Sequence, residues 1–339
     1  YSGVVYQPLG VILAIMPWNF PLWQVFRFAA PAMMAGNVAV LKHASNVCGC
    51  ALAIEELFSD FPPGCFSTLL VESGGVAEII ANPAIAAVTL TGSERAGSSV
   101  ASEAGKAIKK TVLELGGSDP FVVLADANLD YTLEKAVQAR IANAGQSCIA
   151  AKRFIVERQV YGEFVEGLAE RFRGLKVGDP TASHTQIGPM AREDLVDALD
   201  KQVQGSVAAG ARLVTGGKRI DRPGCYYEPT VLSDVRPGMP AFHEETFGPV
   251  AAVTPAQDVD EAITLANLTT FGLGASIWTG ETRGRELAMR IEAGSVFVNE
   301  VVKSDPRLPF GGVKRSGYGR ELSAEGIREF VNIKTIWVR

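Results

Sequence analysis

The stretch "GVILAIM" at residues 10–16 is apolar throughout, and the turn-like "PWNFP" of residues 17–21 follows it directly. A strand with one solvated face alternates apolar and polar residues, so an unbroken apolar run predicts a strand covered on both faces. Helical patterns at 46–58 and 93–107 separate further runs of the same kind, which predicts an α/β fold with a largely parallel sheet. Those further runs are "VAVLK" (38–42), "STLLV" (67–71) and "AAVTLTG" (86–92).

The alternation continues through the second half of the chain. Apolar residues recur every four positions from Leu129 to Ile141, which predicts one buried helical face that ends near Gly145. Cys148 then falls in the turn between this helix and a strand at 152–156. Further strands are expected at 111–115, 120–124, 226–232, 250–253, 275–278, 295–298 and 333–338, and further helices at 160–175 and 192–209.

Composition limits the function classes. The 339 residues carry a net charge of −5, without the basic excess of a nucleic-acid binder, so no nucleic-acid partner is expected. The five cysteines form no CxxC pair and the three histidines have no metal-ligand spacing, so neither a disulfide framework nor a metal site is predicted. Apolar stretches are too short or too interrupted to span a bilayer, so a cytoplasmic protein without a membrane partner is expected.

Several short motifs carry polar groups that can do chemistry. Cys148 in "NAGQSCIAAKRF" (143–154) is a candidate nucleophile, although a lone cysteine is more often a small core residue. Glu114, between Leu113 and Leu115, is a candidate desolvated base, and Asn19 is either a turn residue or an oxyanion donor. "TGSERAG" (91–97) suits either a phosphate site at a helix start or a plain capped helix, with Gly92 in a tight turn and Ser93 at the cap.

Six motifs in one order give the chain a family resemblance. PWNFP, TGSExxG, ELGG, GQSC, EETFGPV and LPFGGVKxSGxGRE resemble the aldehyde dehydrogenase superfamily in order and spacing, over essentially the whole chain. The resemblance implies a Rossmann-type cofactor domain, an α/β catalytic domain and a small oligomerisation β-arm. It places a cofactor domain at 7–114, a catalytic domain at 115–308, a return to the cofactor domain at 309–330, and oligomerisation strands at 1–6 and 331–339.

The resemblance also implies roles for individual residues. Cys148 would attack the aldehyde, Asn19 and the Cys148 N–H would hold the oxyanion, and Glu114 would activate water. The implied cofactor residues are Trp18, Lys42 and Ser45 with Gly92 and Ser93 at the pyrophosphate, and Glu245 and Phe247 at the nicotinamide ribose.

Cofactor and substrate preference follow from details of the pattern. NAD-preferring members often carry a glutamate three residues after the lysine that matches Lys42, whereas Ser45 stands here and leaves room for a 2′-phosphate. We therefore expect NADP to be preferred and NAD to be accepted. The chain is most similar to succinate-semialdehyde dehydrogenases, which implies Arg27 and Ser304 as substrate-carboxylate residues. Ala142 lacks a second arginine that some members carry, and Arg307 is our candidate replacement.

Alternatives stay open at this stage. Residues 1–16 are all that precede Pro17, so the resemblance implies that roughly a quarter of a usual family chain is absent upstream. A non-catalytic homologue or fragment, a CoA-acylating relative, or an enzyme for another short-chain or ω-carboxy aldehyde would share much of this pattern. When full length, a homodimer or homotetramer is expected. Pairing of Cys148 with Cys50 or another thiol in a regulatory disulfide is also open.

Overall fold

The chain forms two compact units. The computed structural model describes residues 1–339 and divides into unit 1, Tyr1–Gly116 with Ser304–Arg339, and unit 2, Gly117–Lys303. Unit 2 is thus an insertion into unit 1, and the chain passes between the units twice. Because the second crossing precedes Ser304, the loop that carries Ser304 and Arg307 belongs to unit 1, although the expected catalytic segment, 115–308, included it.

Unit 1 contains a six-stranded sheet in the order β14-β6-β5-β2-β3-β4. All its pairings are parallel except that of β14 with β6. The chain adds strands outward from β2 on one side and then returns to place β5 on the other, so the connections reverse direction between β2 and β5. The strands are β2 (Val11–Met16), β3 (Val38–His43), β4 (Phe66–Thr68), β5 (Ile85–Thr91), β6 (Lys110–Glu114) and β14 (Gly317–Tyr318).

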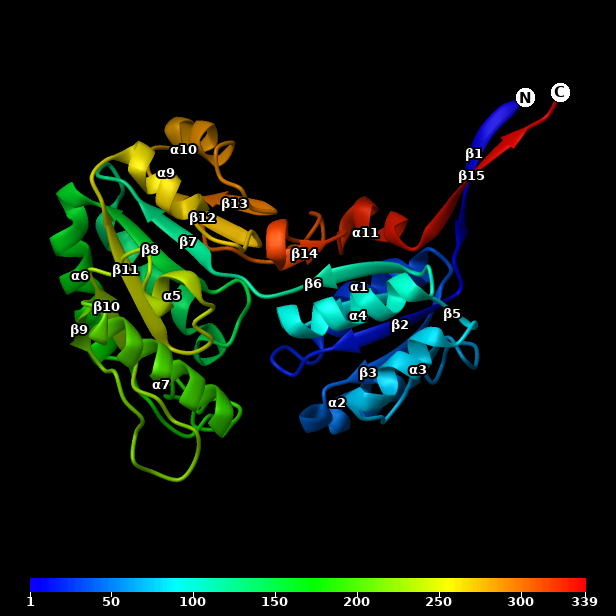
Figure 1. Ribbon diagram of the computed structural model, residues 1–339, viewed down its shortest axis with the longest axis horizontal. Coiled ribbons are helices and arrows are strands. Elements are labelled where there is room, and N and C mark those ends of the chain that lie inside the picture. Colours follow the sequence, from blue (N-terminus) through cyan, green and yellow to red (C-terminus); the bar gives the residue numbers. More distant parts are fainter. The chain divides into compact units, whose positions relative to one another are not determined.

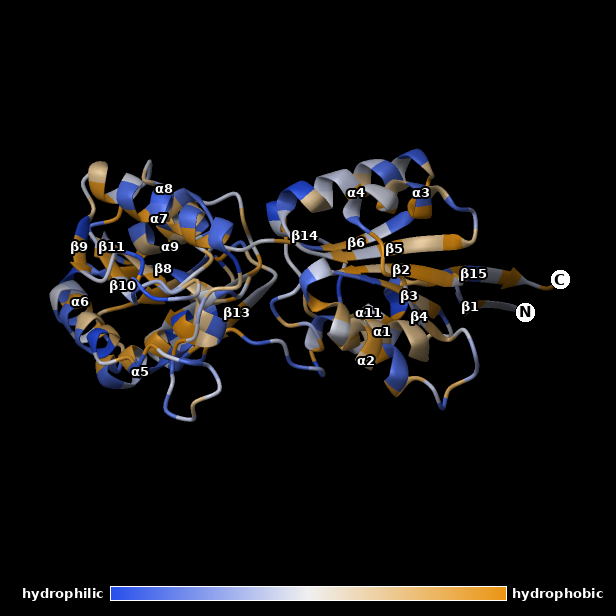
Figure 2. Cartoon of the chain, turned by 90° about the horizontal axis from the view of Figure 1, so that it is seen from below, coloured by the Kyte–Doolittle hydropathy of each residue, from blue (hydrophilic) through white to orange (hydrophobic).

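Helices cover both faces of the unit 1 sheet, which is why its strands are apolar throughout. Ile12, Ala14 and Met16 point to a core shared with α1 and α2, whereas Leu13 between them packs in a core shared with α3 and α4. Figure 2 shows the apolar strands between these two helical layers. The helices are α1 (Trp23–Met34), α2 (Cys48–Leu57), α3 (Val76–Ala81), α4 (Glu94–Lys106) and α11 (Ser323–Glu329).

Unit 2 has the same three-layer design. Its seven-stranded sheet has the order β13-β12-β7-β8-β11-β10-β9, and only β9 is antiparallel. Alternate strand residues face α7–α10 on one side and α5 and α6 on the other. The strands are β7 (Asp119–Val123), β8 (Ala151–Glu157), β9 (Arg212–Thr215), β10 (Thr230–Ser233), β11 (Val250–Ala256), β12 (Gly274–Trp278) and β13 (Ser295–Val298). The helices are α5 (Leu129–Ile141), α6 (Arg158–Arg173), α7 (Glu193–Ala208), α8 (Pro240–His243), α9 (Val259–Asn267) and α10 (Glu281–Ala288).

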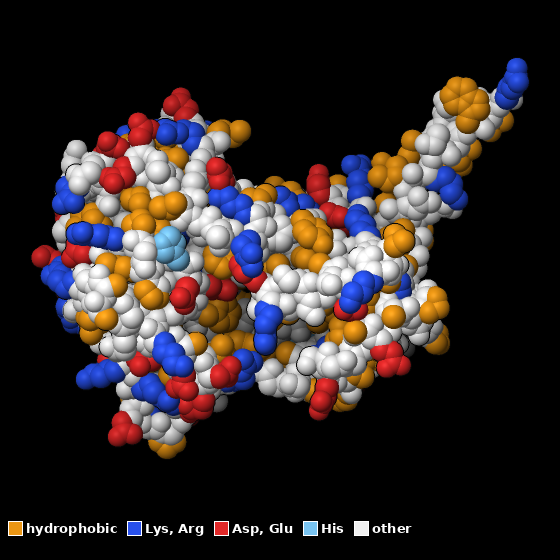
Figure 3. All heavy atoms as spheres, in the orientation of Figure 1, with side chains coloured by type: hydrophobic (Ala, Val, Ile, Leu, Met, Phe, Trp, Pro, Cys, Tyr) orange, Lys and Arg blue, Asp and Glu red, His pale blue; other side chains and the backbone are white.

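The two chain ends form a separate two-stranded arm of unit 1. β1 (Ser2–Pro8) pairs antiparallel with β15 (Val331–Trp337), and the N-terminal amine donates to the Val338 carbonyl at 2.8 Å. Figure 1 shows both termini at the tip of this arm, beyond the six-stranded sheet. Apolar side chains are visible along it in Figure 3. The expected terminal strand is therefore present, with the first residues of the chain as its partner.

The structure confirms the α/β fold and corrects several expected elements. The strand expected at 67–71 ends at Thr68, and α1, which contains Pro31, was not among the expected helices. The helix expected to end near Gly145 ends at Ile141, because Asn143 and Ala144 adopt left-handed backbone angles. No helix has the length and apolar character needed to cross a membrane.

Candidate active site

The carboxyl edge of the unit 1 sheet gathers many of the predicted residues. Because β2, β3, β5 and β6 are parallel, the residues that end each strand lie along one edge. Open parallel sheets bind ligands at this edge, where the connections reverse direction, which here is between β2 and β5. The residues are Trp18 and Asn19 after β2, Lys42 and Ser45 at the end of β3, Gly92 and Ser93 after β5, and Glu114 at the end of β6.

Gly92 and Ser93 form the start of α4. The Ser93 Oγ accepts a hydrogen bond from the Ala96 N–H at 3.3 Å, which confirms the predicted helix cap. Gly92 does not adopt a left-handed conformation, and an added Cβ would make only ordinary contacts, 3.5 Å from Leu90 Cδ2. The chain bends at Gly92, and neither its backbone angle nor a neighbouring atom requires glycine there.

Lys42 is the residue of this edge whose setting best fits a charged ligand. Its side chain is only 9% exposed, and its ammonium, which is not fully buried, makes no hydrogen bond or ion pair with the chain. A lysine with a buried stem and an accessible ammonium can donate to an acceptor that a ligand supplies. Ser45, three residues on, is exposed at the start of a short 3₁₀ turn, Ser45–Val47. Both positions suit the ribose of a nucleotide.

Asn19 is oriented by a neighbouring amide. The Gln24 Nε2 donates to the Asn19 Oδ1 at 3.1 Å, which fixes the amide so that its NH₂ group lies on the side away from Gln24. An amide donor with a fixed direction is what oxyanion stabilisation requires, because donors that are already in place need no reorganisation during the reaction.

Glu114 belongs to a buried charged cluster of unit 1. Burial raises its pKa well above the usual range, and the charge of Glu321 raises it further, while Arg27 and Arg320 lower it. Arg27 is itself buried, forms an ion pair with Glu321, and has its guanidinium carbon 4.2 Å from the centre of the Phe310 ring. The pattern around Glu114 predicted a desolvated carboxyl, and the structure has one.

The predicted substrate residues already have partners within unit 1. The Ser304 Oγ accepts a hydrogen bond from the Trp23 Nε1 at 2.7 Å. Arg307 is highly exposed and forms a two-pronged pair with Asp305, at 2.9 and 2.7 Å. Arg27 pairs with Glu321 in the interior. Each arginine therefore has a carboxylate partner already, so a substrate carboxylate would join or displace it.

Cys148 lies at the amino edge of the unit 2 sheet, in a turn with an unusual backbone. Asn143, Ala144 and Gly145 all have positive φ values of 52°, 53° and 75°. Only glycine fits at 145, because an added Cβ would lie 2.2 Å from the Gly248 carbonyl oxygen. The buried Gln146 accepts from the Ala191 N–H at 2.8 Å and so secures the turn. Cys148 is half-buried and is in no disulfide. Strain of this kind, held in place by packing, is characteristic of functional sites.

Two buried cations that sequence reasoning missed support this turn. Lys152, fully buried, donates to the carbonyls of Ser147, Cys148 and Ala150 at 2.9, 2.8 and 3.3 Å. Arg140, equally buried, donates to the carbonyls of Ala151, Gly145, Thr246 and Gly248. Burial lowers the pKa of Arg140 to about 9 and also lowers that of Lys152. A lysine and an arginine in apolar segments carry no local signal of burial, since such residues are rarely buried.

Glu245 lies near Cys148 at this edge. Its Oε1 accepts the Gly117 N–H at 3.1 Å and lies 3.6 Å from the Lys152 ammonium. Burial raises the pKa of Glu245, and Lys152 lowers it. Phe247, two residues on, is half-buried. Cys148 and Glu245 therefore meet through Lys152 and the backbone of Gly117.

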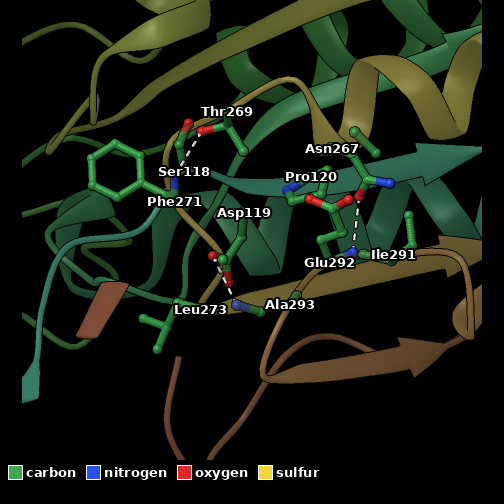
Figure 4. Close-up of a pocket in the computed structure, with 13 residues that line it drawn as sticks. Ser118, Asp119, Pro120, Asn267, Thr269, Phe271, Leu273, Ile291, Glu292 and Ala293 are labelled. Carbon is green, nitrogen blue, oxygen red and sulfur yellow. Dashed lines mark hydrogen bonds between the residues drawn. The ribbon is translucent and has the colours of Figure 1, made fainter. Parts of the chain in front are cut away.

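A pocket opens beside this edge around Asp119 (Figure 4). The Asp119 Oδ1 accepts the Gly274 N–H at 3.1 Å, and its Oδ2 has no hydrogen-bond partner. Burial raises the pKa of Asp119 to about 7. Thr269, Phe271 and Glu292 are among the lining residues drawn in the figure. Asp119 was not among the predicted site residues.

Residues 1–336 match the aldehyde dehydrogenase family model, and the chain belongs to that family. The fold of two sheet-centred units with a terminal β-arm agrees with this membership, as do solved structures of the family.

Particular relatives share most of the sequence. "Succinate-semialdehyde dehydrogenase [NADP(+)] 1" of Mycobacterium bovis is 58% identical over 336 residues, 98% of this chain and 74% of that protein. "Probable succinate-semialdehyde dehydrogenase [NADP(+)]" of Synechocystis is 58% identical over 340 residues, covering 99% and 75%. The crystal structure of succinic semialdehyde dehydrogenase from Streptococcus pyogenes with NADP+ is 40% identical, with a TM-score of 0.97, covering 99% and 75%.

Proposed function

We propose that this aldehyde dehydrogenase oxidises succinate semialdehyde to succinate and uses NADP+ in preference to NAD+. Another short-chain or ω-carboxy aldehyde is the second candidate substrate. Two residues in unusual environments support the proposal. The half-buried thiol of Cys148 lies after a left-handed turn that Lys152 and Arg140 support, and the buried carboxyl of Glu114, with a raised pKa, lies at the end of β6. The names of the relatives favour this substrate and cofactor.

Cys148 begins the proposed reaction. Its thiolate attacks the aldehyde carbon and forms a C–S bond, and the carbonyl oxygen becomes an oxyanion held by the Asn19 amide and the Cys148 N–H. When bound, NADP+ accepts the hydride that this intermediate must lose. The product of that oxidation is a thioester on Cys148.

Glu114 completes the proposed turnover. As the carboxylate it removes a proton from water, whose oxygen attacks the thioester, so that the acid and the Cys148 thiolate are released. Because burial raises the pKa of Glu114, its carboxylate forms at a higher pH than that of an ordinary glutamate, so the proposed base gains activity as the pH rises through this raised pKa. Arg27 and Arg320 limit this rise, and they keep the base usable nearer to neutral pH.

The cofactor-binding roles are proposed from the positions of the residues at the edges of the two sheets. Lys42 and Ser45 hold the adenosine ribose and its 2′-phosphate, and Gly92 and Ser93 face the pyrophosphate at the start of α4. Trp18 lies in the loop after β2, at the same edge. Glu245 and Phe247 take the nicotinamide end. The unpartnered Lys42 ammonium and the room left at Gly92 are the two features of unit 1 that fit a nucleotide.

The proposed substrate-carboxylate residues are Arg27, Ser304 and Arg307. A planar guanidinium suits a carboxylate because it donates two parallel hydrogen bonds. We therefore compare kcat/KM of Arg27→Ala and Arg307→Ala for succinate semialdehyde and for propanal. Loss of preference for succinate semialdehyde supports the assignment, and an unchanged preference in both variants removes it.

The whole protein is proposed to be a cytoplasmic homodimer or homotetramer. The supporting feature is the β1–β15 arm, where Val4, Tyr6, Ile333 and Trp337 lie on one face by the strand register and are all exposed. An exposed apolar face on a two-stranded sheet is typical of an association surface.

One assay separates the proposed function from its alternatives. Formation of reduced cofactor with succinate semialdehyde, measured by absorbance, is expected in the wild type and absent in Cys148→Ala. Turnover without added CoA excludes a CoA-acylating enzyme, and no turnover with any of a panel of aldehydes would indicate a non-catalytic homologue. Repeating the assay with NADP+ and NAD+ gives the cofactor ratio directly.

A further inference from the structure

Lys152 has no part in the proposed reaction. Its ammonium is fully buried and contacts three carbonyls of the nucleophile turn, including that of Cys148 itself at 2.8 Å. The same ammonium lies 3.6 Å from Glu245 Oε1. One buried charge therefore joins the turn that holds the thiol to the carboxylate proposed at the nicotinamide ribose.

The surroundings of this cluster leave little freedom. An added Cβ at Gly117 would lie 2.6 Å from the Cys148 carbonyl oxygen and 3.0 Å from Asp119 Oδ1. Gly117 also donates its N–H to Glu245. The cluster is thus packed from the amino ends of β7, β8 and β11, and a shift of one member moves the others.

Burial lowers the pKa of Lys152, and the charged groups around it partly offset this effect. Glu245 and Asp119 favour the charged form of Lys152, Arg140 opposes it, and a thiolate at Cys148 also favours it. This last interaction is reciprocal, so the ammonium must favour the thiolate by the same free energy. A cation beside a cysteine is a common way to make the reactive thiolate available.

We propose that Lys152 is a positioning residue that holds the Cys148 turn and Glu245 in register and favours the Cys148 thiolate. This inference rests on the proposed role of Cys148. It assigns to Lys152 both a mechanical and an electrostatic effect, and a mainly structural lysine would have only the first.

The test measures the rate of Cys148 alkylation by iodoacetamide against pH in the cofactor-free protein, with Cys148→Ala as the blank. For Lys152→Met we expect the midpoint of the rate profile to move up by about one pH unit, with roughly tenfold slower alkylation at pH 7. Lys152→Arg is expected to restore most of the rate because the charge returns. The control Lys201→Met, which removes an exposed lysine of α7, leaves the profile unchanged.

A second variant keeps the test informative if Lys152→Met does not fold. In Glu245→Gln the competing carboxylate is gone and Lys152 remains, so we expect the midpoint of Cys148 alkylation to move to lower pH without any cofactor present. An unchanged midpoint in either folded variant, Lys152→Met or Glu245→Gln, overturns the proposal. Alkylation needs no turnover, so an inactive wild type with the expected shifts would refute the proposed substrate and leave the role of Lys152 standing.

Discussion

At the scale of single residues, the site depends on a few groups in costly environments. Glu114 is buried near the carboxyl of Glu321. The buried Arg27 forms an ion pair with Glu321, which lowers the free-energy cost of burying the Glu321 charge. Two like charges close together cannot both ionise easily, so each raises the pKa of the other. After burial, the largest influence that raises the pKa of Glu114 is therefore a residue 207 positions away in the sequence, Glu321, near the other end of the chain.

The first prediction concerns this pair. In Glu321→Gln we expect the acidic limb of the kcat–pH profile to move to lower pH, because burial remains but the neighbouring negative charge no longer raises the pKa of Glu114. The measurement is kcat between about pH 5 and pH 9 with saturating aldehyde. Glu103→Gln, at an exposed pair with Lys106, is the control and should leave the limb in place. A limb that stays fixed or moves upward in Glu321→Gln would contradict the coupling.

The second prediction concerns Gly145. A Cβ there would collide with the Gly248 backbone and would be held at a φ of 75°, so Gly145→Ala is expected to lose at least about 3 kcal/mol of unfolding free energy. Gly162→Ala is the matched control, since no atom lies within 4 Å of its added Cβ inside α6. That control should gain up to about 1 kcal/mol. Urea unfolding monitored by fluorescence gives both values, and equal stabilities would refute the packing argument.

At the scale of secondary-structure elements, each unit uses one edge of its parallel sheet. In unit 1 the carboxyl ends of the strands carry Asn19, Lys42, Ser93 and Glu114. In unit 2 the amino ends of β7, β8 and β11 carry the Cys148 turn and the segment with Glu245. Backbone carbonyl groups in the segments outside a sheet cannot all accept hydrogen bonds from neighbouring strands. At this edge, the buried side chain of Arg140 donates to several of these carbonyls.

The third prediction tests that support. Arg140→Met leaves several buried carbonyls without donors, so we expect a loss of about 3–5 kcal/mol of unfolding free energy and faster proteolysis near residues 143–150. Arg285→Met, in an exposed pair with Glu281 on α10, should change stability by less than about 0.5 kcal/mol. Chemical denaturation of both variants is the measurement. An Arg140→Met protein as stable as wild type would show that the carbonyls find other partners.

At the scale of the whole molecule, the β1–β15 arm of unit 1 lies outside the six-stranded sheet of that unit. Its exposed face joins residues from the two ends of the chain, and a two-stranded ribbon has too small a core to be stable alone. Association with a second copy would cover the apolar side chains. The proposed oligomer therefore depends on the two terminal strands, which lie outside the catalytic motifs.

The fourth prediction concerns this face. Trp337→Asp is expected to weaken self-association by about 100-fold, because an apolar surface worth about 3 kcal/mol is replaced by a charge. Light scattering coupled to size exclusion measures the mass as protein concentration is lowered. Lys334→Asp changes the opposite face of the same strand, by the register with Val5, and should retain the wild-type mass. Equal masses for wild type and Trp337→Asp at all concentrations would remove the arm as the interface.

The sequence by itself determined the α/β class, the positions of most strands and the identity of Cys148, Glu114 and Asn19 as candidates. It could do so because two-sided burial makes strands apolar and because motif spacing survives in a linear chain. It did not predict helix α1, which contains Pro31, or the left-handed turn before Cys148.

Only the tertiary structure decided which charges are buried and what they face. Arg27 was expected at a substrate carboxylate and lies in the interior beside Glu321, while Lys152 and Arg140 were not singled out at all. A long side chain has the same sequence signature whether its charge is solvated or buried. Its environment is set by residues that are distant in the chain. The partners of these charged groups, their pKa shifts and their support of the Cys148 turn can therefore be determined only from the folded structure.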